Sequence, residues 1–206
     1  MKVILVNGSP KKNGCTYTAL REVEKSLNKN GIDTEIFWLG AKPMAGCIGC
    51  GTCLEKGKCF VDDKVNEFLE NVPNTDGFVF GTPVHFAASS GMLSSFMDRV
   101  FYGRRKLFSN KVATAVVSCR RGGATAAIDE VNKYFGMNNM PIVSSQYWNM
   151  VHGSKPEDVL KDEEGMQTMR TLGNNMAWLL KCIEAGKNEG VNLPKNEDVI
   201  STNFIR

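Results

Sequence analysis

Short apolar segments alternate with longer amphipathic segments along most of the chain, and this alternation limits the folds open to it. Apolar runs of strand length occur at residues 3–6, 34–39, 77–81, 112–117 and 142–148. Helical patterns follow at 15–30, 61–71, 92–102, 124–135 and 156–185. Strands that alternate with helices form a parallel sheet with helices on both faces. We therefore predict an α/β fold with a doubly wound, five-stranded parallel sheet.

The strand order expected for this pattern is 2-1-3-4-5, the flavodoxin-like arrangement. At 206 residues the chain is predicted to form one domain, residues 1–185, followed by a polar tail at 186–206. A cysteine-rich loop at 44–60 is inserted after the second strand. The net charge of +3 gives no argument for nucleic acid. No apolar run approaches the roughly 20 residues of a membrane span, and no leader is visible, so we expect a cytoplasmic protein.

The segment 3–16 combines a buried strand, a small polar loop and the start of a helix. The N–H groups at a helix start attract anions, and the hydroxyls of Ser9 and Thr16 and the charges of Lys11 and Lys12 would add to this. The spacing does not fit a Walker A loop, because position 13 is Asn where a second Gly is needed. It also does not fit the Gly-x-Gly-x-x-Gly pattern of a dinucleotide loop. A mononucleotide such as FMN suits it better. The alternative is an ordinary turn between a strand and a helix.

Four unusual loops, at 7–16, 40–60, 82–90 and 118–123, follow predicted strands and would meet at one edge of the sheet. After the third strand, His85 and Phe86 offer flat faces for a flavin ring. After the fourth, the segment from Ser118 contains Gly122, where the backbone can approach a ring closely. Arg120 and Arg121 could meet the flavin or the phosphate of a nicotinamide cofactor.

Three segments together resemble the NADPH-dependent FMN reductases, a flavodoxin-like family. They are residues 7–16 (NGSPKKNGCT), 76–85 (DGFVFGTPVH) and 91–99 (GMLSSFMDR), and the similarity spans about residues 1–150. The resemblance implies noncovalent FMN and NAD(P)H as co-substrate. It assigns the FMN phosphate to Ser9, Lys11, Gly14, Cys15 and Thr16. It assigns the isoalloxazine ring to Pro83, Val84, His85 and Phe86.

Four cysteines, Cys47, Cys50, Cys53 and Cys59, lie close together in a glycine-rich stretch. A [4Fe–4S] cluster needs four thiolates around a compact volume. The row resembles the compact cysteine motif of the iron–sulfur flavoproteins, which would place a cluster at the same sheet edge as the flavin. Structural zinc and a loop of metal-free thiols are the alternatives. For Cys15, packing is preferred over a thiol pKa lowered by the helix start.

We expect an FMN-dependent oxidoreductase that passes reducing equivalents from NAD(P)H to a small acceptor such as a quinone or flavin. The alternative is an iron–sulfur flavoprotein that carries electrons to a redox protein partner. Hydride transfer to a flavin needs no acid or base, so no catalytic side chain is nominated. The exposed flavin face and the apolar stripe of segment 156–185 predict a homodimer or homotetramer, with no nucleic-acid or membrane partner.

Overall fold

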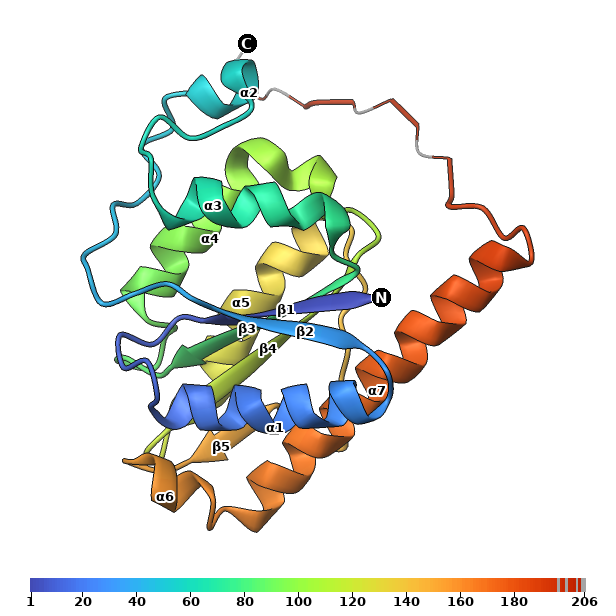
Figure 1. Ribbon diagram of the computed structural model, residues 1–206. Helices are drawn as coiled ribbons and strands as arrows, with labels where there is room; N and C mark the ends of the chain where they lie inside the picture. Colours follow the sequence, from blue (N-terminus) through green and yellow to red (C-terminus); the bar gives the residue numbers. More distant parts are fainter. Residues whose placement is uncertain (196, 199, 203, 205–206) are drawn as a thin grey trace.

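The computed structural model describes residues 1–195, 197, 198, 200–202 and 204. Five parallel strands form one sheet in the order β2-β1-β3-β4-β5, as predicted (Figure 1). The strands are β1 (Lys2–Asn7), β2 (Asp33–Trp38), β3 (Gly77–Pro83), β4 (Val112–Cys119) and β5 (Met150–His152). Every residue of β4 is buried, because helices cover both faces of the sheet. The flavodoxin-like fold is therefore confirmed.

Helices lie in two layers. On one face are α1 (Cys15–Lys29), α6 (Pro156–Val159) and α7 (Glu163–Asn188). On the other are α3 (Lys64–Asn71), α4 (Gly91–Arg104) and α5 (Ala124–Met137), with 3₁₀ turns η1 (Val72–Asn74) and η2 (Arg105–Leu107). A short helix, α2 (Thr52–Lys56), lies within the cysteine-rich loop. The helix expected at 61–71 begins later, at Lys64, because the Asp63 side chain caps it by accepting from Val65 N.

The segment predicted as one helix over 156–185 is two helices, α6 and α7, and α7 continues to Asn188. Its apolar stripe does not face outward. Met169, Leu172 and Met176 are fully buried in the same cluster as Leu20 and Leu27 of α1. The stripe is used within the chain, so it gives no argument for self-association. Among the described residues, no helix has the length and apolar character needed to cross a membrane.

The fifth strand lies later in the chain than the predicted 142–148. Only an isolated bridge joins Ile142 to Ala113, and regular pairing resumes at Met150–His152 alongside Val117–Cys119. Buried side-chain bonds explain the interruption. Thr114 Oγ1 donates to Val143 O at 2.8 Å and accepts from Asn149 Nδ2 at 2.9 Å. The chain between these two anchors loops out and carries the exposed Tyr147 and Trp148.

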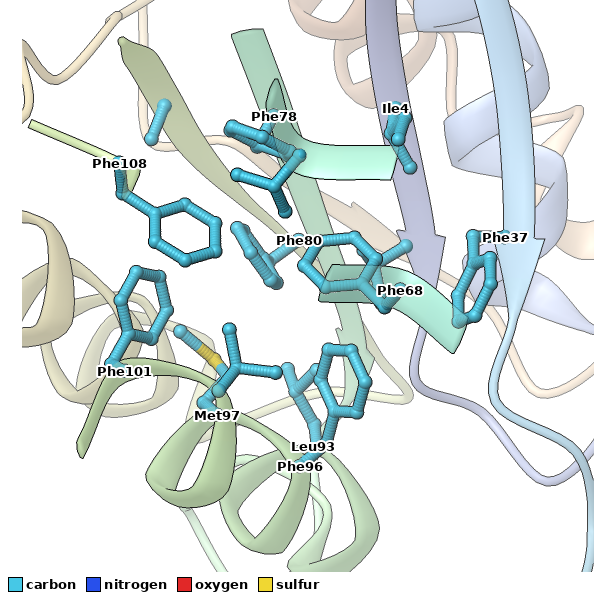
Figure 2. Packing of buried hydrophobic residues seen from close by; sticks show 14 of the residues in the cluster. Ile4, Phe37, Phe68, Phe78, Phe80, Leu93, Phe96, Met97, Phe101 and Phe108 are labelled. Atoms are coloured by element: carbon cyan, nitrogen blue, oxygen red, sulfur yellow. The ribbon is translucent and has the colours of Figure 1, made fainter. Parts of the chain in front are cut away.

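An aromatic cluster fills the space between the sheet and helices α3 and α4 (Figure 2). Phe68 of α3 is fully buried at its centre. Its ring centroid lies 5.1 Å from that of Phe96 and 5.4 Å from that of Phe37. Phe78 and Phe80 of β3 complete the contact at 5.8 and 6.3 Å. The cluster thus fixes α3 and α4, which flank the cysteine-rich loop, onto the sheet.

Replacing Phe68 by Ala should lower the free energy of unfolding by about 3–5 kcal/mol, because it removes the central ring and leaves a cavity. Urea unfolding followed by circular dichroism measures this. Phe204→Ala is the matched control, since Phe204 is 90% exposed and its loss should change stability by less than about 0.5 kcal/mol. Equal effects of the two substitutions would contradict the central role of Phe68.

Candidate functional site

The loop between β1 and α1 is held against β3 by a close backbone contact. Gly8 N donates to Gly81 O at 2.8 Å, and a Cβ on Gly8 would lie only 2.8 Å from that same oxygen. Ser90, the N-cap of α4, donates its hydroxyl to Gly8 O at 2.8 Å. The β1 loop, the end of β3 and the start of α4 are therefore fixed together.

The start of α1 presents backbone donors toward this loop. Its N-cap, Gly14, has no side chain with which to satisfy them. The N–H of Thr18 reaches the Gly14 carbonyl, whereas the N–H groups of a first helical turn have no partner inside the helix. Beside them lies the buried Thr16, whose Oγ1 is 2.8 Å from Ser118 Oγ. Donors, hydroxyls and the Lys11 side chain thus surround one point, which suits an anion.

A cleft of about 360 Å³ opens over this point. Nine of the eleven predicted cofactor residues line it: Ser9, Lys11, Gly14, Cys15, Thr16, Pro83, Val84, His85 and Ser118. Phe86 and Gly122 lie outside its wall. Phe86 is fully exposed with a φ of 51°, in a turn closed by paired backbone bonds between His85 and Ala88. The structure therefore brings the phosphate residues together but turns Phe86 away.

The cleft also has a wall that the sequence analysis missed, formed by Gly153, Ser154, Lys155 and Pro156. Asp158 Oδ2 fixes this segment by accepting from the backbone N–H groups of Ser154 and Lys155, at 3.1 and 3.2 Å. The segment follows β5 directly. A correct placement of β5 would have revealed it, because loops at the carboxyl ends of parallel strands form the ligand site. Arg120 lines the cleft as well, so three cationic side chains border it.

The thiol of Cys15 packs within the fold, which is the role that the sequence analysis preferred. Its Sγ lies 3.6 Å from Gly153 O. Burial raises the pKa of the Cys15 thiol, and this outweighs the lowering by its own backbone N–H and by Lys11. The alternative of a lowered pKa at the helix start is wrong, because loss of water dominates over the helix end.

The four clustered cysteines line one small cavity together with Arg99 and Tyr102 of α4. Cys53 packs so closely on α4 that a Cβ on Gly103 would lie 2.2 Å from its Sγ. Burial raises the pKa of the Cys53 thiol, and the charges of the other three cysteines raise it further. The exposed Cys50 differs, because hydrogen bonds from the side chain and backbone of Thr52 favour the thiolate and lower the pKa of the thiol.

The four thiols border one small cavity, and the metal centres that thiols can hold differ in the geometry they require. In the described part of the chain, no group of three or more His, Cys, Asp or Glu side chains is arranged to hold one metal ion. A structural zinc ion requires four donors around one centre. In a [4Fe–4S] cluster each thiolate binds a different iron, so the sulfur atoms surround a volume rather than a point. Four thiols border one cavity here, so the residues fit a cluster, which stays a prediction.

The cysteine site and the cleft contact different parts of α4. The four cysteines lie against the second half of α4, near Arg99 and Gly103, whereas the cleft borders its start. Gly91 and Gly103 are separated by roughly 18 Å at 1.5 Å per helical residue. In Figure 1, helices α3 and α4 lie between α2 and the turn that joins β1 to α1. The shared sheet edge stays a prediction, since Arg99 also pairs with Asp63 at the start of α3.

A second cavity, of about 770 Å³, lies between α4 and α5. Phe101, Tyr102 and Tyr134 line it, and Cys47 forms part of its wall. Burial raises the pKa of Tyr134, and its hydrogen bond to Asp98 raises it further. A molecule in this cavity would meet the cysteine loop, not the cleft.

A flavodoxin-like sheet with a cleft at its carboxyl edge, next to the start of a helix, is typical of a class of mononucleotide-binding proteins. The NADPH-dependent FMN reductase family matches residues 1–155, and the chain belongs to that family. It is accordingly an FMN flavoprotein oxidoreductase.

Relatives carry a more specific name. An iron-sulfur flavoprotein of Methanocaldococcus jannaschii is 35% identical over 192 residues, covering 89% of this chain and 100% of that protein. An iron-sulfur flavoprotein of Methanosarcina thermophila is 25% identical over 195 residues, covering 92% and 100%. The solved structure of RosB with bound 8-demethyl-8-formylriboflavin-5'-phosphate gives a TM-score of 0.71 at 16% identity, covering 100% of this chain and 94% of that one. At this identity it supports the fold alone.

The thiols should differ in alkylation by iodoacetamide in metal-free protein at about pH 7, where only thiolates react. Cys50 should react faster than Cys15 and Cys119, because burial raises the pKa of the latter two thiols. Raising the pH should speed the reaction of Cys15, since more of its thiol ionises. Peptide mapping by mass spectrometry at several times measures each rate. Faster labelling of Cys15 than of Cys50 would contradict these pKa directions.

Proposed function

We propose that the chain passes reducing equivalents from NAD(P)H to a small acceptor such as a quinone or flavin, using FMN in the cleft and a [4Fe–4S] cluster in the cysteine loop. The observation that carries the proposal is the convergence of nine predicted cofactor residues on one cleft at the carboxyl edge of the sheet. Family membership supports FMN, and the names of the relatives support the cluster.

In this proposal the first turn of α1 binds the FMN phosphate. Its backbone N–H groups, the Thr16 hydroxyl and the Lys11 charge act on the phosphate oxygens. Ser9 holds the loop in shape, because its Oγ accepts from Lys11 N at 3.2 Å. We add Lys155 to the proposed binding residues, since it lines the cleft and Asp158 fixes its backbone.

The isoalloxazine would lie along Pro83, Val84 and His85, where β3 ends. FMN, when bound, supplies hydride and single-electron transfer. The chain positions the ring and leaves one face open to NAD(P)H and to the acceptor. Hydride transfer needs no acid or base from its side chains. Phe86 and Gly122 remain predicted contacts only, because the structure places them outside the cleft wall.

The second candidate is an electron carrier for a redox protein, without NAD(P)H turnover of its own. The exposure of the cysteine loop favours it. Cys47 and Cys50 are exposed, and Ile48, Leu54 and Phe60 around them are 72%, 65% and 58% exposed. An apolar surface around a redox centre suits a transient protein contact. The same exposed surface supports the proposal of a homodimer or homotetramer. The apolar stripe of α7 does not support it, because that stripe is buried against α1 within the chain.

FMN binding should depend on the Thr16 hydroxyl. Thr16→Val should weaken FMN by roughly tenfold to hundredfold, because a hydrogen bond to a charged group contributes about 1.5–3 kcal/mol. Riboflavin, which lacks the phosphate, should bind both proteins alike. Quenching of flavin fluorescence measures both affinities. Thr18→Val is the matched control, since Thr18 Oγ1 donates to Gly14 O within its own helix. An equal loss for riboflavin would contradict a phosphate role.

Anaerobic protein should carry FMN, iron and sulfide, and its flavin absorbance should bleach on addition of NADH or NADPH. Metal analysis and visible spectra measure this. Reduction by neither nucleotide would favour the carrier function. Less than about one iron per chain after anaerobic reconstitution would contradict the cluster, which needs four.

A further inference from the structure

Arg99 is a buried charge at the cysteine loop. Its side chain is 2% exposed, and a guanidinium in such a place requires partners for its charge and its donors. Asp63 supplies the charge, with Oδ2 at 2.6 Å from Nη1 and Oδ1 at 2.9 Å from Nη2. This bidentate pair joins α4 to the N-cap of α3.

The remaining donors of Arg99 reach the loop itself. Nη1 donates to Ala45 O at 3.4 Å and Nη2 to Val61 O at 3.1 Å, so one side chain binds both ends of the cysteine-rich segment. Nε and Nη2 also lie 3.4 and 3.3 Å from Cys59 Sγ and donate to it. The loop is therefore gathered around one guanidinium on a rigid helix.

Cys59 is held more firmly than the other clustered cysteines. Beyond the two bonds from Arg99 to its sulfur, its backbone N–H donates to Asn66 Oδ1 at 2.9 Å. Its carbonyl accepts from Asn66 Nδ2 at 3.0 Å, and Asn66 is buried in α3. By contrast, Cys50 Sγ bonds only its neighbour Thr52.

Two N–H groups aimed at one sulfur suit a metal-bound thiolate. A neutral thiol is a weak acceptor, whereas a thiolate accepts charge-assisted bonds from a guanidinium. Hydrogen bonds to cluster sulfurs are also among the factors that set a reduction potential, because they favour the more negative, reduced state. A buried ion pair alone is weak support for a purely stabilising role.

We propose that Arg99 is the positioning residue of the cysteine site: it holds Cys59 and both ends of the loop in place before metal is taken up, and through its two N–H···S bonds it raises the reduction potential of the bound cluster. The second part rests on the proposed function, since it requires the cluster. The first part stands on the contacts of Arg99 alone.

The test compares Arg99→Lys with two controls. Lysine keeps the charge near Asp63 but cannot donate to Asp63 and Cys59 together. Arg104→Lys makes the same chemical change on the same helix, at a residue next to the loop whose guanidinium makes no described hydrogen bond to a cysteine sulfur. Asp63→Asn removes the ion pair but leaves Arg99 beside Cys59, and asparagine still caps α3.

In metal-free full-length protein, Arg99→Lys should increase amide hydrogen exchange across residues 45–61, while α5 and the sheet keep their protection. Arg104→Lys should leave exchange in that segment unchanged. Unchanged exchange in Arg99→Lys would overturn the positioning role. This arm needs no cluster, so its result is independent of whether the proposed function holds.

In anaerobic protein with its cluster, Arg99→Lys should shift the reduction potential to more negative values. We expect about a tenfold change in the ratio of reduced to oxidised cluster at fixed potential, or about 59 mV for one electron. Asp63→Asn should not shift it in that direction. A potential equal to wild type in Arg99→Lys, or an equal negative shift in Asp63→Asn, would overturn the tuning role. Wild-type protein without iron would refute the cluster, and the tuning role with it.

Discussion

The contact between Gly8 and Gly81 is the constraint on which the cleft depends. It brings the loop after β1 against the end of β3, where a Cβ at either position would clash with backbone or with α1. The Ser90 hydroxyl adds the start of α4 to the same point. Because α1 begins at the end of this loop, the contact also sets where its free N–H groups point. The shape of the cleft therefore follows from sheet packing, and not from its polar residues alone.

The sequence predicted what depends on local pattern. The strand order follows from the alternation of strand and helix patterns, and the structure confirms it. Spacing and glycines also predicted the Ser9 and Thr16 loop and the row of cysteines, and the residues of each line one cavity. It could not predict features set by long-range side-chain bonds. The Thr114–Asn149 bond interrupts the last strand, and the displaced strand end brings Lys155 to the cleft. Arg99 was visible only as part of a motif, because its partners lie 36 to 54 residues away.

Two sites with different characters share one chain. The cleft is assembled from loops after strands, so any α/β protein of this class offers its framework. The cysteine site is assembled around a helix, with Arg99, Tyr102 and Gly103 supplying its floor. The aromatic cluster around Phe68 stabilises the cysteine site, because it fixes α3 and α4 to each other. The position of the cysteine-rich loop thus depends on the aromatic core, although the loop lies outside that core.

Helix α4 touches both sites, one at each end. Ser90 ties its start to the β1 loop, and Arg99 ties its later turns to the cysteines. The spacing between two redox groups held there would be a property of helical rise, which loop movements do not alter. Electron tunnelling falls steeply with distance, so the rate of transfer between two such groups would depend on this helical spacing. A change in the composition of the cysteine loop would then leave that spacing unaltered.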